Sequence, residues 1–473
     1  MISVTDIRDL LPSSPTFGRI GRRPGSHRSG VAKLAINRIT AAQEPVRFID
    51  LIRDLPRLSP QEFAGLNRGG RARYPPVRGA RQDGDLLSHM SEHPYPREAY
   101  DLIIVGAGCA GLACAIEAAD LGRKVAVLEK MARPAGNILF AGGAVCAAGT
   151  RFQQAQGISE EVEPFYRDLL AVSQQRGDPD LLRVYAEKSA EAIHWLSDAV
   201  GVQWAPISER LPPVNCRVHQ VTGPLRPGGA QLVRDLLNAA EKRTIPIIFR
   251  VTTQRLIPDA KGGISGAQVL LGGKVMEIRA RGGVVLATGG FHANREMVGA
   301  YIGEWAARMP FRGSTANTGE NITLSEPFGP KLVNMDQFHG GPIHGPTRAN
   351  PSSAVNHGIC VTPEGRRYVD EGWTYVRVGR ETALKSPNNQ AFIILDQAAR
   401  KNPIVNDRFE RYGRARAPIY EDEDIEGLAR KAGICAETLA RTVRDFNRAV
   451  QVRRTDRLVP PNTLDFPHPV DTP

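Results

Sequence analysis

The stretch Tyr100-Asp-Leu-Ile-Ile-Val-Gly-Ala-Gly-Cys-Ala-Gly111 places a run of apolar strand residues directly before a Gly-x-Gly-x-x-Gly turn. The pattern continues with a helical segment at Gly111–Leu121 and a second strand at Lys124–Glu129. A strand, a glycine turn, a helix and a second strand at this spacing are typical of a βαβ unit with parallel strands. The stretch therefore predicts an α/β fold built on a parallel sheet.

The residue types in this turn indicate what the unit binds. Gly106 permits the tight turn, Gly108 lets the backbone approach a pyrophosphate, and Gly111 lets the helix pack closely on the strand. The helix amino end, with Ala110 in its first turn, offers NH groups and a positive dipole to phosphates. Glu129 lies 21 residues after Gly108, where a carboxylate can accept both ribose hydroxyls. The unit is predicted to bind a dinucleotide.

Two further motifs favour FAD over NAD. After the second strand the chain reads Lys130-Met-Ala-Arg-Pro-Ala-Gly-Asn137 and then Ala141-Gly-Gly143, and a later strand, Gly283–Thr288, leads into Ala287-Thr-Gly-Gly290. Together these motifs resemble the fumarate reductase/succinate dehydrogenase flavoprotein superfamily. The resemblance implies FAD, held noncovalently because Ile-Leu-Phe follows Asn137 where succinate dehydrogenases have a flavin-linked histidine. It assigns cofactor contacts to Lys130, Gly136, Asn137, Gly142, Gly143, Ala287, Thr288 and Gly289.

Five motifs in the second half are most similar to the tricarballylate-dehydrogenase-like flavoproteins of this superfamily. The resemblance implies an FAD-binding Rossmann-like domain of glutathione-reductase type, interrupted by an α+β cap domain. It also implies oxidation or reduction of a carbon–carbon bond next to a carboxylate, on a tricarballylate- or fumarate-like acid. The motifs are GGFHAN (289–294), NTGENI (317–322), FHGGP (338–342), GRRYVDEG (365–372) and TYVRVGR (374–380).

The resemblance also implies catalytic residues. An arginine after the Arg-x-x-Asp-Glu segment falls on Arg380, with Arg377 second, and acts on the proton side or clamps a substrate carboxylate. His339 matches the substrate-binding histidine of the superfamily. The Glu and Arg relay of fumarate reductases has no counterpart in 350–357, which makes fumarate reduction by that relay doubtful.

Two alternatives stay open. A 3-ketosteroid dehydrogenase-like flavoprotein would use Tyr368 or Tyr375 as its hydroxyl. A truncated, inactive remnant is the other, because the family continues after Pro-x-Asp-Thr-Pro whereas this chain stops at Asp471-Thr-Pro473. On that reading FAD binds weakly and turnover is slow or absent.

Composition bounds the remaining possibilities. The 473 residues are 41% hydrophobic, enough for two or three domains, and the net charge is +11. Residues 1–100 hold 16 of the basic and 10 of the acidic residues, and the Arg/Gly-rich stretch 67–82 resembles RNA-binding tails. No aromatic stacking platform accompanies that charge, so no nucleic-acid partner is expected.

The expected organisation has four parts. Residues 1–89 form a disordered or spurious extension, with Met90 as the natural start. Residues 90–295 are the first part of the FAD-binding domain, 296–390 the cap and substrate region, and 391–473 a truncated return toward the FAD domain.

The cysteine usage and the hydropathy complete the expectations. Six cysteines without a CxxC pair argue against a metal site and favour a reducing cytoplasm. The absence of an 18-residue apolar run excludes a membrane span. Without a CxxCH haem motif, electrons are expected from an external donor or acceptor.

Overall fold

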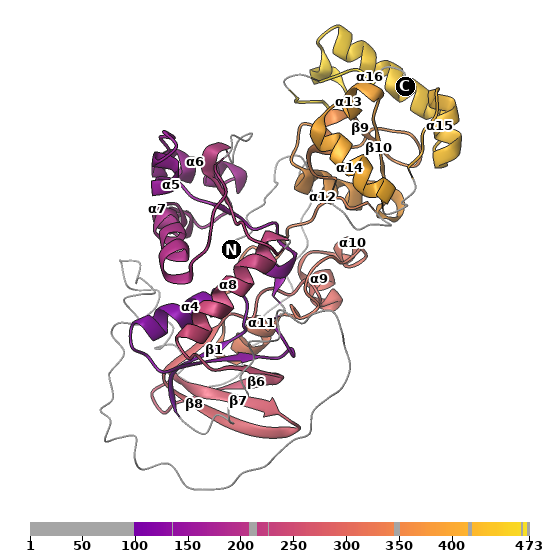
Figure 1. The fold of residues 1–473 in the computed structure, drawn as a ribbon. Helices are drawn as coiled ribbons and strands as arrows, with labels where there is room; N and C mark the ends of the chain where they lie inside the picture. The colour runs from indigo at the N-terminus through magenta and orange to yellow at the C-terminus, as the bar shows by residue number, and fades with distance from the viewer. Residues whose placement is uncertain are drawn as a thin grey trace. The chain divides into compact units, whose positions relative to one another are not determined.

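The computed structural model of the chain divides into two compact units (Figure 1). Unit 1 holds the described residues up to Asn294 together with Gly313–Asn334, and unit 2 holds Arg295–Arg312 and the described residues from Met335 onward. The predicted extension 1–89 and the start at Met90 lie outside the described residues. By residue number, the structure describes 99–134, 136–207, 215–225, 227–344, 351–414, 419–464 and 467–470.

Unit 1 is built on a six-stranded sheet of order β5-β2-β1-β8-β7-β6. Its first four strands are parallel neighbours, and the β8-β7-β6 part is antiparallel. The central strand β1 pairs with β2 on one side and with β8 on the other, so both of its hydrogen-bonding edges are paired. The bounds are β1 (Tyr100–Val105), β2 (Val125–Glu129), β5 (Ile247–Phe249), β6 (Val251–Pro258), β7 (Ile264–Leu271) and β8 (Lys274–Leu286).

Two helices, α4 (Cys109–Asp120) and α8 (Gly228–Lys242), lie over one face of this sheet (Figure 1). Their Leu112 and Leu236 side chains are fully buried in a core shared with alternate residues of β1 and β2. The other residues of β1, such as Ile103, pack in a second core with β7 and β8. A parallel sheet buried on both faces is the arrangement that the βαβ pattern predicts. The predicted α/β fold is confirmed.

Along the chain, a largely helical segment of unit 1 is inserted between strands β2 and β5. It contains α6 (Val162–Val172), α7 (Pro179–Trp195) and the short ladder of β3 (Ala144–Cys146) with β4 (Val218–Gln220). Arg217, only 2% exposed, forms ion pairs with Glu160 and Asp168, which holds the ladder to the helices. Beside it, the one-turn helix α5 (Arg151–Gln154) begins with a Thr150 capping box.

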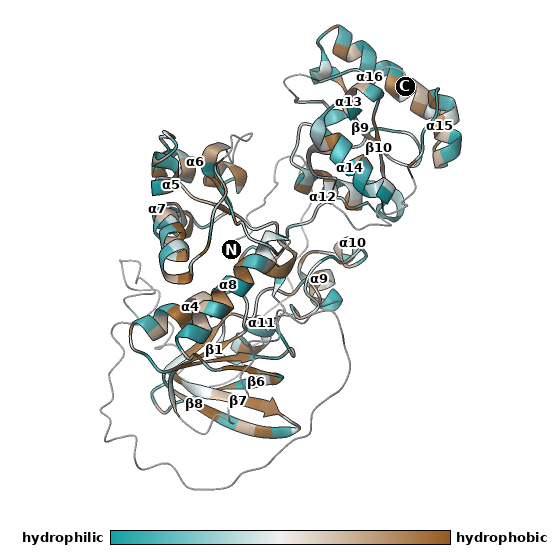
Figure 2. Ribbon diagram, viewed as in Figure 1, coloured by the Kyte–Doolittle hydropathy of each residue, from teal (hydrophilic) through white to brown (hydrophobic). Residues whose placement is uncertain are grey.

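Unit 2 packs helices against a two-stranded sheet of β9 (Ile359–Val361) and β10 (Phe392–Ile394). Helix α16 (Ala436–Gln451) turns Leu439, Val443 and Phe446 into the core. Figure 2 shows that hydrophobic and hydrophilic residues both occur along this helix. The remaining helices are α9 (Arg295–Tyr301), α10 (Glu304–Ala307), α12 (Tyr375–Lys385), α13 (Gln397–Arg400), α14 (Pro403–Arg414) and α15 (Ile425–Ala432).

Three local features differ from the sequence pattern. The strand-like run Ile247–Ile257 forms two strands, because Arg250 adopts a left-handed conformation (φ 59°) between β5 and β6. The expected strand Gly283–Thr288 is the last part of a longer strand, β8, which begins at Lys274 and ends at Leu286. Helix α12 occurs where the pattern indicates no helix.

None of the helices among the described residues is both long and apolar enough to span a membrane.

Candidate functional site

The glycine turn between β1 and α4 is shaped by backbone contacts that exclude side chains. Gly106 has φ 110°, and a Cβ atom there would lie 2.4 Å from the carbonyl oxygen of Ala287. A Cβ on Gly111 would lie 1.9 Å from the carbonyl oxygen of Gly106. Gly108 differs, because a Cβ there would meet no atom within 4 Å. The turn is therefore closed at two glycines and open at the third.

The amino end of α4 presents unsatisfied NH groups at this open position. Gly108 is the N-cap of the helix and supplies no side-chain cap. The first intrahelical bond runs from Leu112 N to Gly108 O at 3.0 Å. The first-turn NH groups, including that of Ala110, precede this bond. Such NH groups, together with the helix dipole, form an anion-binding site.

Glu129 ends β2 beside the turn, as its spacing predicts. Its carboxylate accepts hydrogen bonds from the backbone NH groups of Ala107 and Met131, both at 2.9 Å. These bonds fix the carboxylate at the carboxyl end of the strand. A carboxylate has about four acceptor positions, so it keeps capacity for hydroxyl donors.

The segment after β8 runs alongside the same turn. Ala287 N donates to Val105 O at 2.8 Å, which continues the strand pairing beyond Leu286. The hydroxyl of Thr288 is buried and has no hydrogen-bond partner among the described residues. Gly289 has φ 80° and packs against the side chain of Asn317. An unpaired buried hydroxyl next to an open turn is a polar group that a ligand can satisfy.

The segment after β2 contacts the turn from another direction. A Cβ on Gly136 would lie 3.2 Å from the Cα atom of Gly108. Asn137 Oδ1 accepts a hydrogen bond from Ser314 N at 2.8 Å. Gly143 (φ 82°) lies against the backbone of Gly228 at the start of α8. Gly142, between these contacts, has open space at its Cβ position.

Lys130 is held by acceptors of its own unit. Its ammonium forms an ion pair with Glu320 and donates to Thr318 Oγ1 at 2.9 Å. Burial raises the pKa of Glu320, but hydrogen bonds from Lys130 and Thr318 outweigh it and hold that pKa below its usual value. The predicted cofactor contact of Lys130 thus coexists with an ion pair that neutralises its charge.

Unit 2 gathers a second set of the predicted residues. A Cβ on Gly379 of α12 would lie 2.6 Å from the backbone of Gly341, so the helix and the FHGGP segment are in close contact. The Arg380 guanidinium lies 5.7 Å from the ring centre of Trp305 and 5.9 Å from that of Phe338. We call this set the Arg380 cluster; it consists of Trp305, Phe338, His339, Tyr375 and Arg380.

His339 and Tyr375 form the polar side of the Arg380 cluster. The Tyr375 hydroxyl lies 3.5 Å from His339 Nε2, the long limit of a hydrogen bond, and the two rings meet edge to face at 6.1 Å. His339 is exposed, yet crowding by its neighbours lowers its pKa. Burial raises the pKa of Tyr375, although the charge of Arg312 acts in the opposite direction. Both groups are therefore neutral at pH 7.

Arg377 has a different environment from Arg380. Its guanidinium stacks 3.0 Å from the ring centre of Trp373, and its Nε is buried without a hydrogen-bond partner among the described residues. Burial lowers the pKa of Arg377 although Glu381 and Asp370 raise it. Because it stacks on a separate ring, Arg377 is not part of the Arg380 cluster.

The Arg-x-x-Asp-Glu segment directly precedes α12, and its two carboxylates are fixed by hydrogen bonds within unit 2. Glu371 is fully buried and accepts four hydrogen bonds, from Arg367 Nη2 at 2.5 Å, Arg367 Nε at 3.0 Å, Cys360 N at 2.9 Å and Asn462 Nδ2 at 3.0 Å. Such a saturated carboxylate has no acceptor left for a substrate. Asp370 Oδ1 accepts from two backbone NH groups and closes the turn before the helix.

Comparison with known proteins identifies the family. Residues 101–469 match the family described as FAD binding domain. This chain belongs to that FAD binding domain family. The superfamily resemblance drawn from the sequence is confirmed, and FAD is the cofactor.

Relatives of this FAD binding domain are named as reductases or oxidoreductases. The chain is 29% identical to the NADH:fumarate oxidoreductase of Klebsiella pneumoniae, over 76% of this chain and 38% of that protein. It is 27% identical to the probable fumarate reductase Ifc3 of Shewanella frigidimarina, over 74% and 59%. The urocanate reductase of Eggerthella lenta is 30% identical over 57% and 46%. The chain spans less than two thirds of the length of each of these relatives.

Solved structures give the same picture. The FAD binding domain matches an open flavocytochrome c3 fumarate reductase with a TM-score of 0.62 and 26% identity, over 80% of this chain and 65% of the other. It matches the 3-ketosteroid-Δ4-(5α)-dehydrogenase of Rhodococcus jostii RHA1 with a TM-score of 0.62 and 26% identity, over 79% and 82%.

The described residues of unit 1 fit FAD. The open space at Gly108 and the free first-turn NH groups of α4 suit the pyrophosphate, and Glu129 suits the ribose. When bound, FAD accepts or donates a hydride. Sequence reasoning missed Ser314, Thr318 and Glu320 as neighbours of this site. Thr318 and Glu320 belong to the NTGENI motif, which was used for the resemblance alone, whereas Ser314 lies before it.

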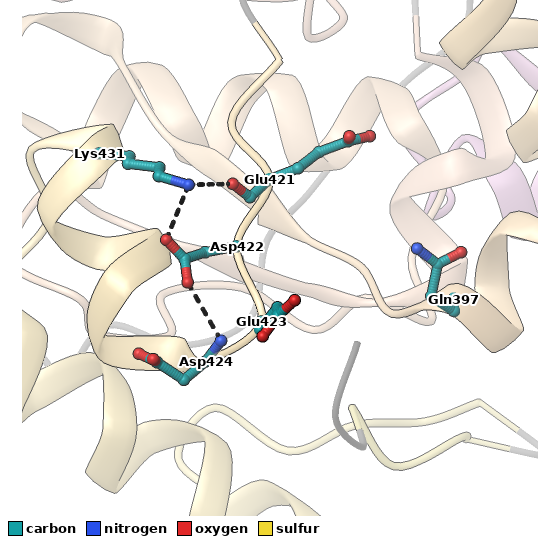
Figure 3. Close-up of a pocket in the computed structure, with 6 residues that line it drawn as sticks. All are labelled: Gln397, Glu421, Asp422, Glu423, Asp424 and Lys431. Carbon is teal, nitrogen blue, oxygen red and sulfur yellow. Dashed lines mark hydrogen bonds and ion pairs between the residues drawn. The ribbon is translucent and has the colours of Figure 1, made fainter.

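A pocket elsewhere in unit 2 has the wrong charge for an acidic substrate. Figure 3 shows Lys431 paired with Asp422 and with the backbone of Glu421. Asp424 caps α15 through Gly427 N. The lining residues are Gln397, Glu421, Asp422, Glu423, Asp424 and Lys431, none of them a predicted site residue. Four carboxylates against one ammonium repel a carboxylate, so this pocket is not assigned to the reaction.

Proposed function

We propose that the chain is an FAD-dependent oxidoreductase that acts on a carbon–carbon bond next to a carboxylate. The observation that carries this proposal is the combination, in one FAD binding domain, of an open glycine turn and an Arg380 guanidinium without a carboxylate partner among the described residues. A cation that the protein leaves unneutralised favours an anionic ligand.

The names of the relatives support this reaction class. Fumarate and urocanate, which appear in the names of the relatives, are both unsaturated acids. Each of these acids has a double bond next to a carboxylate. Within this class we propose fumarate- and tricarballylate-like acids as the first substrates to try. An external donor or acceptor would supply or remove the electrons.

The roles proposed for the predicted residues follow from their chemistry. Arg380 would grip a substrate carboxylate through its planar fork and stabilise the charge that develops beside the reacting carbon. His339, neutral and exposed, would orient the substrate by accepting or donating one hydrogen bond. Arg377 would support the local positive potential, since its stacked guanidinium has less freedom to reach a ligand.

A second candidate is a ketosteroid dehydrogenase, which the similarity to the Rhodococcus enzyme favours. The structure separates the two tyrosines that this alternative invokes. Tyr368 is buried and its hydroxyl lies 2.7 Å from Thr382 Oγ1, so it is part of a core. Tyr375 lies beside His339, so it is the hydroxyl that a steroid carbonyl would use.

The test is anaerobic flavin spectroscopy on the full chain. Purified protein is expected to carry FAD, and the reduced flavin is expected to be reoxidised by fumarate but not by a 3-ketosteroid that has a ring double bond conjugated to its carbonyl. The reverse preference, with loss of activity in Tyr375→Phe and not in Tyr368→Phe, would establish the steroid candidate. A protein that binds FAD and reacts with neither compound contradicts the proposed reaction class.

A further inference from the structure

The buried side chain of Asn317 in unit 1 has no partner for its carboxamide. Asn317 is only 6% exposed, and no described residue of the chain forms a hydrogen bond with its Oδ1 or Nδ2. The similarly buried Asn462 differs, because its Nδ2 donates to Glu371 Oε2 and its Oδ1 accepts from Leu464 N. A buried polar group that the protein leaves unpaired indicates a partner from outside the chain.

Backbone hydrogen bonds fix the position of Asn317. Its carbonyl oxygen accepts from Ala293 N at 3.0 Å, and two residues later Gly319 N donates to Gly290 O at 3.2 Å. A Cβ on Gly289 would lie 2.8 Å from Asn317 Nδ2, so the carboxamide lies against the backbone of Gly289, which is itself exposed. The unpaired carboxamide is therefore held at the segment that follows β8.

The order of the strands shows which half of FAD belongs near this segment. Strand β1 lies between β2 and β8, and all three are parallel, so their carboxyl ends lie at one edge of the sheet. The adenosine ribose belongs at Glu129, at the end of β2, and the pyrophosphate belongs at the glycine turn after β1. The other half of the dinucleotide therefore continues toward the end of β8.

The ribityl chain is the part of FAD that directly follows the pyrophosphate. A Cβ on Gly106 would lie 2.4 Å from Ala287 O, so the end of β8 adjoins the glycine turn. Gly289 is two residues beyond Ala287, at most about 7 Å further along the chain, a distance that a five-carbon chain can bridge. Each ribityl hydroxyl can donate and accept a hydrogen bond, which matches the two donors and one acceptor of a carboxamide.

We propose that Asn317 binds the ribityl hydroxyls of FAD and thereby distinguishes FAD from an adenine nucleotide without a flavin. Its carboxamide oxygen accepts a hydrogen bond from one hydroxyl, and its nitrogen donates one. Thr288, whose buried hydroxyl also has no partner among the described residues, precedes Gly289 and offers a further contact. This role of Asn317 concerns the cofactor alone, so it goes beyond the proposed function and does not depend on the acid that reacts.

The experiment compares FAD with ADP by isothermal calorimetry on the full chain freed of its cofactor. ADP has the adenosine and the two phosphates but no ribityl chain. Asn317→Ala is expected to raise the Kd for FAD at least about tenfold and to change the Kd for ADP less than about twofold. The absorption spectrum of bound FAD is expected to stay unchanged, because the ribityl hydroxyls are not conjugated to the flavin ring.

The control is Asn238→Ala in the carboxyl-terminal half of α8, which is expected to change neither Kd. Asn317→Leu, which keeps a branched side chain, repeats the test if Asn317→Ala does not fold. An equal loss of FAD and ADP affinity overturns the inference, because Asn317 then only supports the segment after β8. An unchanged Kd for FAD overturns it as well. A shifted flavin spectrum in Asn317→Ala places the carboxamide at the ring and overturns the assignment to the ribityl chain.

Discussion

The glycine-turn site of unit 1 and the Arg380 cluster of unit 2 are built in opposite ways. The first is made of backbone: glycines whose missing side chains leave room, free NH groups at a helix end, and one carboxylate fixed by two backbone bonds. The second is made of long side chains from α10, the FHGGP segment and α12.

This difference teaches where each site is vulnerable. A backbone site is lost when any side chain fills the space of the ligand, whatever the chemistry of that side chain. A side-chain site is lost when the functional group changes shape, even if its charge remains. The first two predictions separate these two kinds of failure.

The largest effect is expected for Gly108→Val. The new side chain finds open space in the protein and Gly108 has an ordinary negative φ, so the fold should persist. The same space is needed by the pyrophosphate, so the Kd for FAD is expected to rise by at least about 1000-fold, or about 4 kcal/mol. Isothermal calorimetry with FAD and a thermal melt of the apoprotein measure the two properties separately.

Two matched variants sharpen this prediction. Gly111→Ala should destabilise the apoprotein itself, since its Cβ would lie 1.9 Å from the carbonyl oxygen of Gly106. Gly413→Ala, in α14 with open space at its Cβ, should change neither property. Retained FAD affinity in Gly108→Val would show that the pyrophosphate lies elsewhere.

The second effect is expected in unit 2, for Arg380→Lys. The charge stays but the planar fork is lost, so the half-reaction between flavin and acid should slow by about 100-fold, or about 2.7 kcal/mol. FAD content should not change. Arg377→Lys, whose guanidinium stacks on Trp373, is the matched control and should slow the same step by less than about tenfold. Comparable rates for the two variants in anaerobic stopped flow would remove Arg380 from the mechanism.

The same contrast explains how much of the molecule could be predicted. The turn and its flanking strands lie within 30 consecutive residues, and each glycine has a local steric reason that the sequence displays. Glu129 follows from the same spacing. The geometry of the glycine turn was therefore predictable almost residue by residue.

The Arg380 cluster was only partly predictable. Family resemblance pointed to Arg380 and His339, but Trp305 joins them from α10, about 75 residues earlier in the chain. The periodicity of TYVRVGRETALK does not predict a helix. Few of its residues are buried, so the apolar pattern is weak, and Gly379 lowers the helix propensity. The close contact of Gly379 with Gly341 is a tertiary fact that no local pattern encodes.

A smaller effect is expected for Glu129→Ala in unit 1. Two backbone NH groups lose their acceptor, and the ribose loses a charge-assisted partner worth about 1.5–3 kcal/mol. The Kd for FAD is expected to rise about 10- to 150-fold, less than for Gly108→Val. Glu129→Gln keeps an oxygen acceptor and should fall between Ala and wild type. An unchanged Kd in calorimetry would mean that the ribose lies away from β2.

The smallest effect concerns acid stability and compares the buried His219 of unit 1 with the exposed His339 of unit 2. His219 is fully buried; its Nε2 lies 2.8 Å from Thr150 Oγ1 and its Nδ1 lies 3.0 Å from Arg217 O. Burial lowers its pKa below the ordinary value of 6.5. As pH falls through that ordinary value, the unfolded state gains a proton that the folded state does not bind, so the stabilisation is present above pH 6.5 and is lost below it.

Urea unfolding at about pH 7.5 and about pH 5.5 measures this effect. The free energy of unfolding of the wild type should fall between the two pH values, and the fall should be about 1 kcal/mol smaller in His219→Gln. His339→Gln should reduce that loss less, because an exposed imidazole can be protonated in the folded state; an equal reduction in the two variants would contradict the difference in burial on which the comparison rests.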